Sequence, residues 1–249
     1  MPATRRLLLK SLRHFRSRLQ SWQERSREPG LTALLIVEAS LIFIAVPLAS
    51  MGVIPEMIVP ALFVLLVIAI LVVTSRSHVA AGVVIVAVAL SPFGVLVHAE
   101  HPSVLTEWLS AIGRLLALAA LSYVIARAVF APGRVTLHRV QGAIVLYMNF
   151  ALFFFVIYRL MAALLPKVFS GPGLPPTGAE HGSGAALLYF SFSTLTTAGF
   201  GDITPVHPLA RNLANLESVI GQLYPATLLA RLVSLELEHR RQSKQRSPD

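Results

Sequence analysis

The stretch YFSFSTLTTAGFGD, Tyr189–Asp202, decides how this chain is interpreted. It lies partly within an apolar segment, Gly184–Leu195, whose length of about twelve residues predicts a helix too short to cross a hydrocarbon core ~30 Å thick. Glycine follows at alternate positions, Gly199 and Gly201, and glycine adopts positive φ without a steric clash. We therefore expect a re-entrant half-helix followed by a segment in which the handedness of the backbone alternates. A membrane tolerates such a backbone only where it is buried in protein or lines a watery path.

An alternating backbone directs successive carbonyl oxygens to one side, where they can replace the hydration shell of a cation. The C-terminal, negative end of the half-helix dipole favours a cation at the same place. One chain supplies one wall of such a site, so a closed ring predicts a homotetramer. The predicted selectivity filter consists of Thr197, Ala198, Gly199, Phe200 and Gly201, with the Thr197 hydroxyl as a further ligand and Asp202 as a negative charge at the outer mouth.

The composition around this stretch is that of an integral membrane protein. Of the 249 residues, 55% are hydrophobic and 13% are charged, and the mean hydropathy is +0.70, whereas a soluble domain is about 25% charged. We expect an all-α membrane protein with six transmembrane helices and the re-entrant half-helix between the fifth and the sixth. The expected spans are 31–49, 54–74, 79–98, 104–130, 143–166 and 207–236.

Membrane topology explains most of the net charge of +9. Eight lysines and arginines lie in residues 1–30, and the other basic loop residues lie on the same side as the N-terminus if each span is a simple crossing. The positive-inside rule therefore predicts a multi-pass protein of the cell membrane with both termini in the cytoplasm. Nucleic acid is not needed as a partner. Leu8, Leu12, Phe15, Leu19 and Trp22 share one helical face, which predicts a basic amphipathic helix that orients the first span or binds anionic lipids.

These observations divide the chain into five expected parts. They are a cytoplasmic basic amphipathic segment (1–30), a four-helix transmembrane region (31–130), a cytoplasmic linker (131–142), a pore domain with outer helix, pore helix, filter and inner helix (143–236), and a cytoplasmic tail (237–249).

The stretch Tyr189–Asp202 resembles the pore helix and selectivity filter of tetrameric potassium channels, which usually read T-V-G-Y-G-D. Thr197, Gly199, Gly201 and Asp202 match that pattern, Phe200 replaces tyrosine and Ala198 replaces valine. The resemblance covers roughly residues 140–240. It implies a potassium channel subunit that conducts K⁺ passively, with no enzymatic activity, no cofactor and no metal other than the permeant ion. The smaller Ala198 leaves a less selective cation channel as an alternative.

The sixth expected span supplies the predicted gating residues. Gly221 lies where the resemblance implies a hinge, and Pro225 interrupts the helical hydrogen bonds, so we expect a bend there, either mobile or static. Helical spacing predicts a pore-lining face formed by Gln222, Ala226, Leu229 and Val233.

Few ionisable residues lie inside the expected spans. Glu38 and Arg114 are expected to form an intramembrane ion pair, and a second pair, Arg159 with Glu217, competes with hydrogen bonds from Glu217 to Ser191 or Ser193. The fourth span carries only Arg114 and Arg127, whereas steep voltage gating needs three or four charges in each subunit. We therefore expect weak or absent voltage dependence.

Other functional classes find less support in the sequence. A cluster of His98, Glu100 and His101 is interpreted as an ordinary outer loop rather than a metal site. A potassium transporter with a related filter would carry four pore repeats, and this chain has one. A silent channel subunit remains an alternative, and no acid–base or metal constellation indicates a membrane enzyme.

Overall fold

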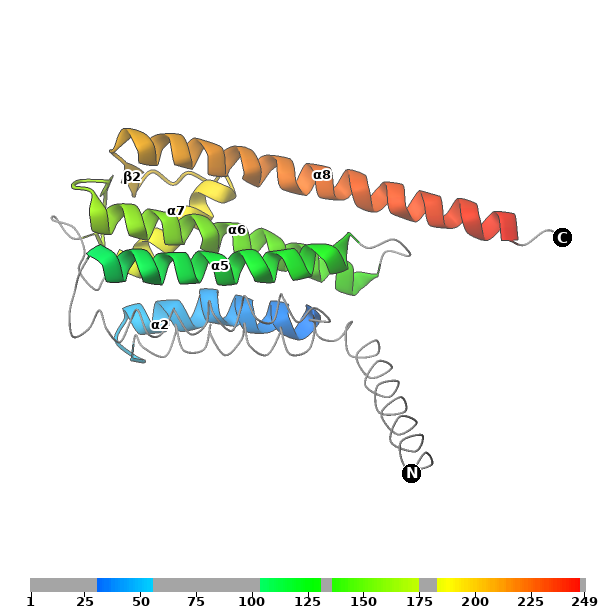
Figure 1. The fold of residues 1–249 in the computed structure, drawn as a ribbon, viewed down its shortest axis with the longest axis horizontal. Helices are drawn as coiled ribbons and strands as arrows, with labels where there is room; N and C mark the ends of the chain where they lie inside the picture. Colours follow the sequence, from blue (N-terminus) through cyan, green and yellow to red (C-terminus); the bar gives the residue numbers. More distant parts are fainter. Residues whose placement is uncertain (1–30, 56–103, 131–135, 175–182, 247–249) are drawn as a thin grey trace, which may run out of the picture.

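The structure is a computed structural model that describes residues 31–55, 104–130, 136–174 and 183–246. These ranges are almost entirely helical, and Figure 1 shows the long helices lying side by side. Within these ranges, three helices are long and apolar enough to cross a membrane: Leu31–Ser50, Glu107–Arg127 and Leu137–Leu164. The expected spans 54–74 and 79–98, and the basic segment 1–30, lie outside the described residues.

The first helix, Leu31–Ser50, contains one widened turn. Its middle portion, η1 (Leu41–Ala45), is π-helical and leads directly into α2 (Val46–Ser50). Pro47 follows this widened turn and has no amide hydrogen to donate back into the helix. The expected span 31–49 therefore exists as one helix with a local change in winding.

The α5 helix (Val104–Val129) and the α6 helix (Leu137–Leu164) run antiparallel beside the first helix. A Cβ atom at Gly142, near the start of α6, would meet Val129 at 3.0 Å and Leu31 at 3.2 Å. The end of α5 and the starts of the other two helices therefore meet at one point. The Thr32 hydroxyl strengthens this junction by hydrogen bonds to His138 (2.8 Å) and to Gln141.

The α6 helix is longer at its start than the expected span 143–166. It begins at Leu137 because Thr136 is extended, so part of the expected linker 131–142 is helical. It ends at Leu164, and Leu165 adopts an extended conformation immediately before Pro166. This is the backbone conformation that a following proline favours.

A two-stranded sheet brackets the part of the chain that carries the predicted filter. The β1 strand (Phe169–Ser170) pairs antiparallel with β2 (Thr204–Pro205), and Phe169 lies opposite Pro205. Between the strands lies α7 (Ser183–Leu195), an apolar helix of 13 residues, ~20 Å long at 1.5 Å per residue. The expected short helix is thus observed, and it packs between α6 and α8.

The α8 helix (Pro208–Arg246) is one continuous helix of 39 residues that contains Pro225. It extends beyond the ends of the other helices (Figure 1), because the expected tail 237–249 is helical as far as Arg246. It is not among the described helices that are apolar enough to be recognised as a span. The reason is its polar residues, since Arg211, Asn215, Glu217 and Gln222 interrupt the apolar sequence.

Aromatic side chains form the core beneath the short helix. Tyr158 on α6 is fully buried and packs edge to face against Phe190 of α7 and Phe169 of β1, with ring centroids 5.2 and 5.4 Å apart. Such aromatic pairs add directional packing to the area that they bury. This core fixes α7 and the strand β1 against α6, and so it positions the segment that follows α7.

Candidate functional site

The segment 196–202 leaves the C-terminal end of α7 through a tight turn. The Thr196 amide donates a hydrogen bond to the Phe192 carbonyl (3.0 Å), and the Thr196 hydroxyl donates to the same oxygen (2.7 Å). The helical hydrogen-bond pattern therefore continues one residue beyond Leu195 before the chain turns. The negative end of the α7 dipole consequently faces the start of the segment.

The backbone of this segment alternates in handedness, as the glycine spacing predicts. Thr197, Gly199 and Gly201 have φ values of +57°, +55° and +80°, while Ala198 and Phe200 between them do not have positive φ. The positive φ of Thr197 was not predicted, since a β-branched residue rarely adopts this conformation. Gly199 has room for a side chain, because no atom lies within 4 Å of a Cβ built there. The positive φ, and not a close contact, is therefore the reason for glycine at this position.

The amide groups of residues 197–200 donate hydrogen bonds back to the end of α7. The Thr197 amide donates to Thr194 O (3.0 Å), and the amides of Ala198 and Gly199 donate to Ser193 O (2.9 and 3.3 Å). The Phe200 amide donates to the Ser193 hydroxyl (3.4 Å). Among the described residues, no hydrogen bond ends on the four carbonyl oxygens from Thr197 to Phe200. These oxygens are therefore free to bind a ligand.

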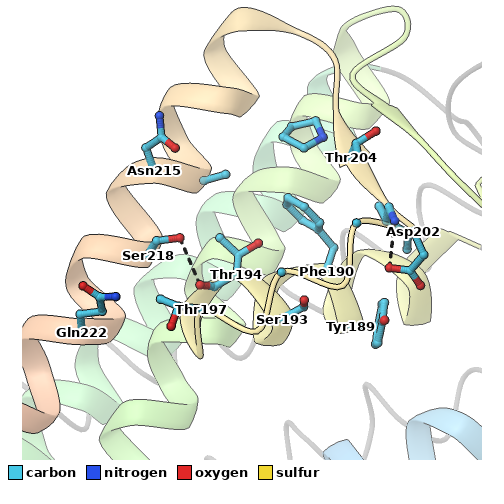
Figure 2. A pocket seen from close by; sticks show the side chains of 15 residues that line it. Tyr189, Phe190, Ser193, Thr194, Thr197, Asp202, Thr204, Asn215, Ser218 and Gln222 are labelled. Atoms are coloured by element: carbon cyan, nitrogen blue, oxygen red, sulfur yellow. Dashed lines mark hydrogen bonds between the residues drawn. The ribbon is translucent and has the colours of Figure 1, made fainter.

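Asp202 ends the segment and is held from three sides. Its Oδ1 accepts a hydrogen bond from the Ile203 amide (3.0 Å), and the Tyr189 hydroxyl interacts with its carboxylate. Gly171 packs against the main chain of Asp202. A Cβ atom at Gly171 would lie 2.4 Å from Asp202 O. The Tyr189 ring stacks on Phe200, with centroids 5.9 Å apart and an interplanar angle of 11°. Figure 2 shows Tyr189 and Asp202 at the same end of the segment.

The α8 helix packs directly on the C-terminal end of α7. A Cβ at Gly221 would lie 1.8 Å from the Leu195 carbonyl oxygen, so the two backbones touch at this glycine. The Ser218 hydroxyl donates to Thr194 O (3.2 Å; Figure 2), and the Tyr147 hydroxyl on α6 donates to Leu195 O (3.1 Å). Gly221 was expected as a hinge, and the structure gives it a packing role because only glycine permits this approach.

The four predicted pore-lining residues lie on an uncovered face of α8. Gln222 and Ala226 are exposed, and Leu229 and Val233 are 62% and 58% exposed. Thr197 and Gln222 both border a pocket of about 480 Å³ between the segment and α8 (Figure 2). Apolar side chains that remain this exposed in one subunit indicate a surface that another molecule covers. Their role in lining a pore stays a prediction.

A cluster of three fully buried polar side chains joins α6, α7 and α8. The Tyr158 hydroxyl donates to Glu217 Oε2 (2.7 Å), and the Ser191 hydroxyl contacts both Glu217 Oε1 and Ala151 O, the latter at 2.8 Å. The expected pair of Arg159 with Glu217 does not form, because Arg159 is exposed whereas the carboxyl group is enclosed. The alternative contact with Ser191 is observed. Tyr158 was missed, although a tyrosine in an apolar span is a signal for such a bond.

The expected ion pair between Glu38 and Arg114 does not form in this structure. The Arg114 guanidinium donates to Ser110 O (3.1 Å) and Ser110 Oγ (2.9 Å), one turn away on its own helix. Both carboxylate oxygens of Glu38 are buried and have no hydrogen-bond partner in the ranges that the structure describes. The prediction was wrong because it used depth along the helix axes, which does not determine the direction of a side chain around each axis.

The described part of the chain contains no group of three histidine, cysteine, aspartate or glutamate side chains that could hold a metal ion. The cluster of His98, Glu100 and His101 lies outside the described residues.

A comparison with known families agrees with this geometry. Residues 142–237, which include most of α6 and α8, all of α7 and the segment 196–202, match a family model described as an ion channel. No curated protein matches the chain. The chain is therefore a membrane protein that carries an ion channel domain at residues 142–237.

Proposed function

We propose that this chain is a subunit of a potassium-selective channel in which four copies surround one pore. The observation that carries the proposal is the backbone of the segment 196–202. The amides of residues 196–200 are bonded to α7, the φ values from Thr197 to Gly201 alternate in sign, and no hydrogen bond among the described residues ends on the carbonyl oxygens from Thr197 to Phe200. Rings of such oxygens replace the hydration shell of K⁺ during conduction.

The same observation supports a homotetramer. One subunit presents its carbonyl oxygens from a single direction, so an ion needs further copies to complete its coordination. Closed rotational symmetry supplies equivalent copies around one axis. The exposed face with Gln222, Leu229 and Val233 would then line the path below the segment, and Asp202 would lie at its outer end.

Potassium flux into liposomes tests the proposal. Purified protein reconstituted with a K⁺ gradient should conduct passively, and Gly199→Ala should reduce the flux at least tenfold. A side chain at positive φ costs ~1–2 kcal/mol, so four subunits together lose ~4–8 kcal/mol at the ring. Gly184→Ala is the matched control, because a Cβ at this helical glycine meets nothing within 4 Å. Equal flux from the two variants would contradict the proposed role of the segment.

A second candidate function is a monovalent cation channel that discriminates weakly between K⁺ and Na⁺. The observation that favours it is Ala198, which is exposed in the subunit and has a smaller side chain than the valine of the usual filter. Reversal potentials in mixed K⁺ and Na⁺ separate the two candidates. A reversal potential that follows the K⁺ gradient alone supports potassium selectivity. Flux that needs a co-substrate would instead indicate a transporter, and absence of flux would indicate a silent subunit.

We also propose a location in the cell membrane with both termini in the cytoplasm and weak or absent voltage dependence. The charge pattern supports the orientation. Arg114, one of the two arginines in α5, is engaged with Ser110 of the same helix, which supports a structural role. Binding of anionic lipids to the basic segment 1–30 stays a prediction.

A further inference from the structure

Glu217 is the most deeply buried acidic or basic residue among the described residues of the ion channel domain. It is 0% exposed, as are its neighbours Tyr158 and Ser191. Among the described residues no basic side chain bonds to it, and Arg159, the neighbour of Tyr158 in sequence, is exposed. An ionised carboxylate without a counter-charge is strongly disfavoured in such surroundings.

The number of protons in the cluster can be counted from its contacts. Three oxygen–oxygen contacts form a chain: Tyr158 to Glu217, Glu217 to Ser191, and Ser191 to the Ala151 carbonyl. Each contact needs one proton to be a hydrogen bond. The two hydroxyl groups supply one proton each, and the Ala151 carbonyl is only an acceptor. The Ser191 hydroxyl has one proton and contacts two acceptor atoms, so the three contacts are three separate two-centre hydrogen bonds when the Glu217 carboxyl group supplies the third proton.

We propose that Glu217 is a neutral carboxylic acid that acts as a positioning residue for the segment 196–202. Its Oε2 accepts from the Tyr158 hydroxyl, its own O–H donates to Ser191 Oγ, and the Ser191 hydroxyl donates to Ala151 O. This chain of hydrogen bonds ties α8, α7 and α6 together without burying a net charge.

The position of the cluster relates it to the segment. Ser191 lies two residues before Ser193, whose carbonyl and hydroxyl oxygens hold the amides of Ala198, Gly199 and Phe200. Ser218 directly follows Glu217 on α8 and donates to Thr194 O. A shift of α7 at Ser191 therefore moves the anchor of the predicted filter. This positioning role rests on the proposed channel function, whereas the protonation state does not.

Infrared difference spectroscopy tests the protonation state on the full-length protein in lipid at neutral pH. The wild-type minus Glu217→Gln spectrum should contain the C=O stretching band of a protonated carboxyl group. Tyr158→Phe should shift this band to higher frequency, because the carbonyl loses its donor. Absence of the band, or its replacement by carboxylate bands, would overturn the proposal. So would a band that Tyr158→Phe leaves unmoved.

Flux measurements on two variants test the positioning role. Glutamine supplies both an N–H donor for Ser191 and a carbonyl acceptor for Tyr158, so Glu217→Gln should retain the flux within about threefold. Glu217→Ala leaves both hydroxyls unpaired and should lower the flux at least tenfold. Equal flux from the two variants, or loss in Glu217→Gln, would overturn the role. If no variant and no wild-type protein conducts, the channel function fails, while the infrared band still decides the state of Glu217.

Discussion

Two buried glutamates, Glu217 and Glu38, occupy opposite kinds of environment. Both are almost completely inaccessible, at 0% and 1% exposure. Glu217 has a hydrogen-bond partner at each oxygen, from two different helices. Glu38 has none in the described part of the chain, and neither has the amide of Asn149 on α6.

The difference shows that helices in this molecule are joined in two ways, by directional hydrogen bonds or by apolar packing. Around the segment 196–202, α6, α7 and α8 are linked by polar bonds with fixed directions, which hold each helix at one rotation. The first helix contributes apolar side chains to the interior, such as Leu34 and Ile42, and its side-chain hydrogen bonds to the other described helices lie at its start, at Thr32. Apolar packing tolerates small shifts better than directional bonds do.

The largest effect is expected at Gly221, where the polar region is also most tightly packed. Gly221→Ala places a methyl group 1.8 Å from Leu195 O, which forces α8 away from α7. Overpacking of this kind costs ~1–3 kcal/mol in each subunit. We expect loss of the assembled oligomer in size-exclusion chromatography and loss of K⁺ flux. Stable assembly with normal flux would show that α8 does not need this contact.

Removal of one directional bond should have a smaller effect. Tyr158→Phe leaves Glu217 Oε2 buried without a donor and should lower the stability by ~1–3 kcal/mol. The measurement is the thermal unfolding midpoint in detergent. Tyr123→Phe on α5 is the control, since Tyr123 is 60% exposed. Equal midpoints for both variants would remove the distinction between the two regions.

Glu38→Leu should change the stability in the opposite direction. It removes a buried carboxyl group that has no hydrogen-bond partner among the described residues and keeps a side chain of similar size, so we expect a gain of ~1–3 kcal/mol in the free energy of unfolding. A higher unfolding midpoint together with unchanged flux would sharpen the comparison. A lower midpoint would show that Glu38 acquires a partner in the assembled protein.

The smallest effect is expected at Arg114. The Arg114 guanidinium bonds to Ser110 of its own helix, so Arg114→Gln breaks no hydrogen bond between the described helices. One charge crossing the full field corresponds to ~2.3 kcal/mol per 100 mV. We expect the conductance–voltage relation to remain unchanged in this variant. A steep relation in the wild-type protein that is flattened by Arg114→Gln would contradict the proposed absence of voltage sensing.

The sequence was sufficient to predict the structure where segment length, apolarity and glycine spacing determine the backbone conformation. Length and apolarity predicted the first helix, α5, most of α6 and the short α7, and the spacing of Gly199 and Gly201 predicted positive φ at both. It was insufficient where a contact depends on how two distant helices are rotated. The pair of Glu38 with Arg114 was wrong for this reason, and the contact of Gly221 with α7 was not foreseen.

The great length of α8 has a mechanical consequence. At 1.5 Å per residue its 39 residues measure ~58 Å, about twice the ~30 Å of a hydrocarbon core. Leu228 is the last of its residues that packs against a described core cluster. From there to Arg246 the helix is a rod of ~27 Å, so a tilt of ~10° at Leu228 displaces its end by ~5 Å. A weak force applied near Arg246 therefore produces a large torque at Leu228, where the helix begins to pack against the rest of the protein.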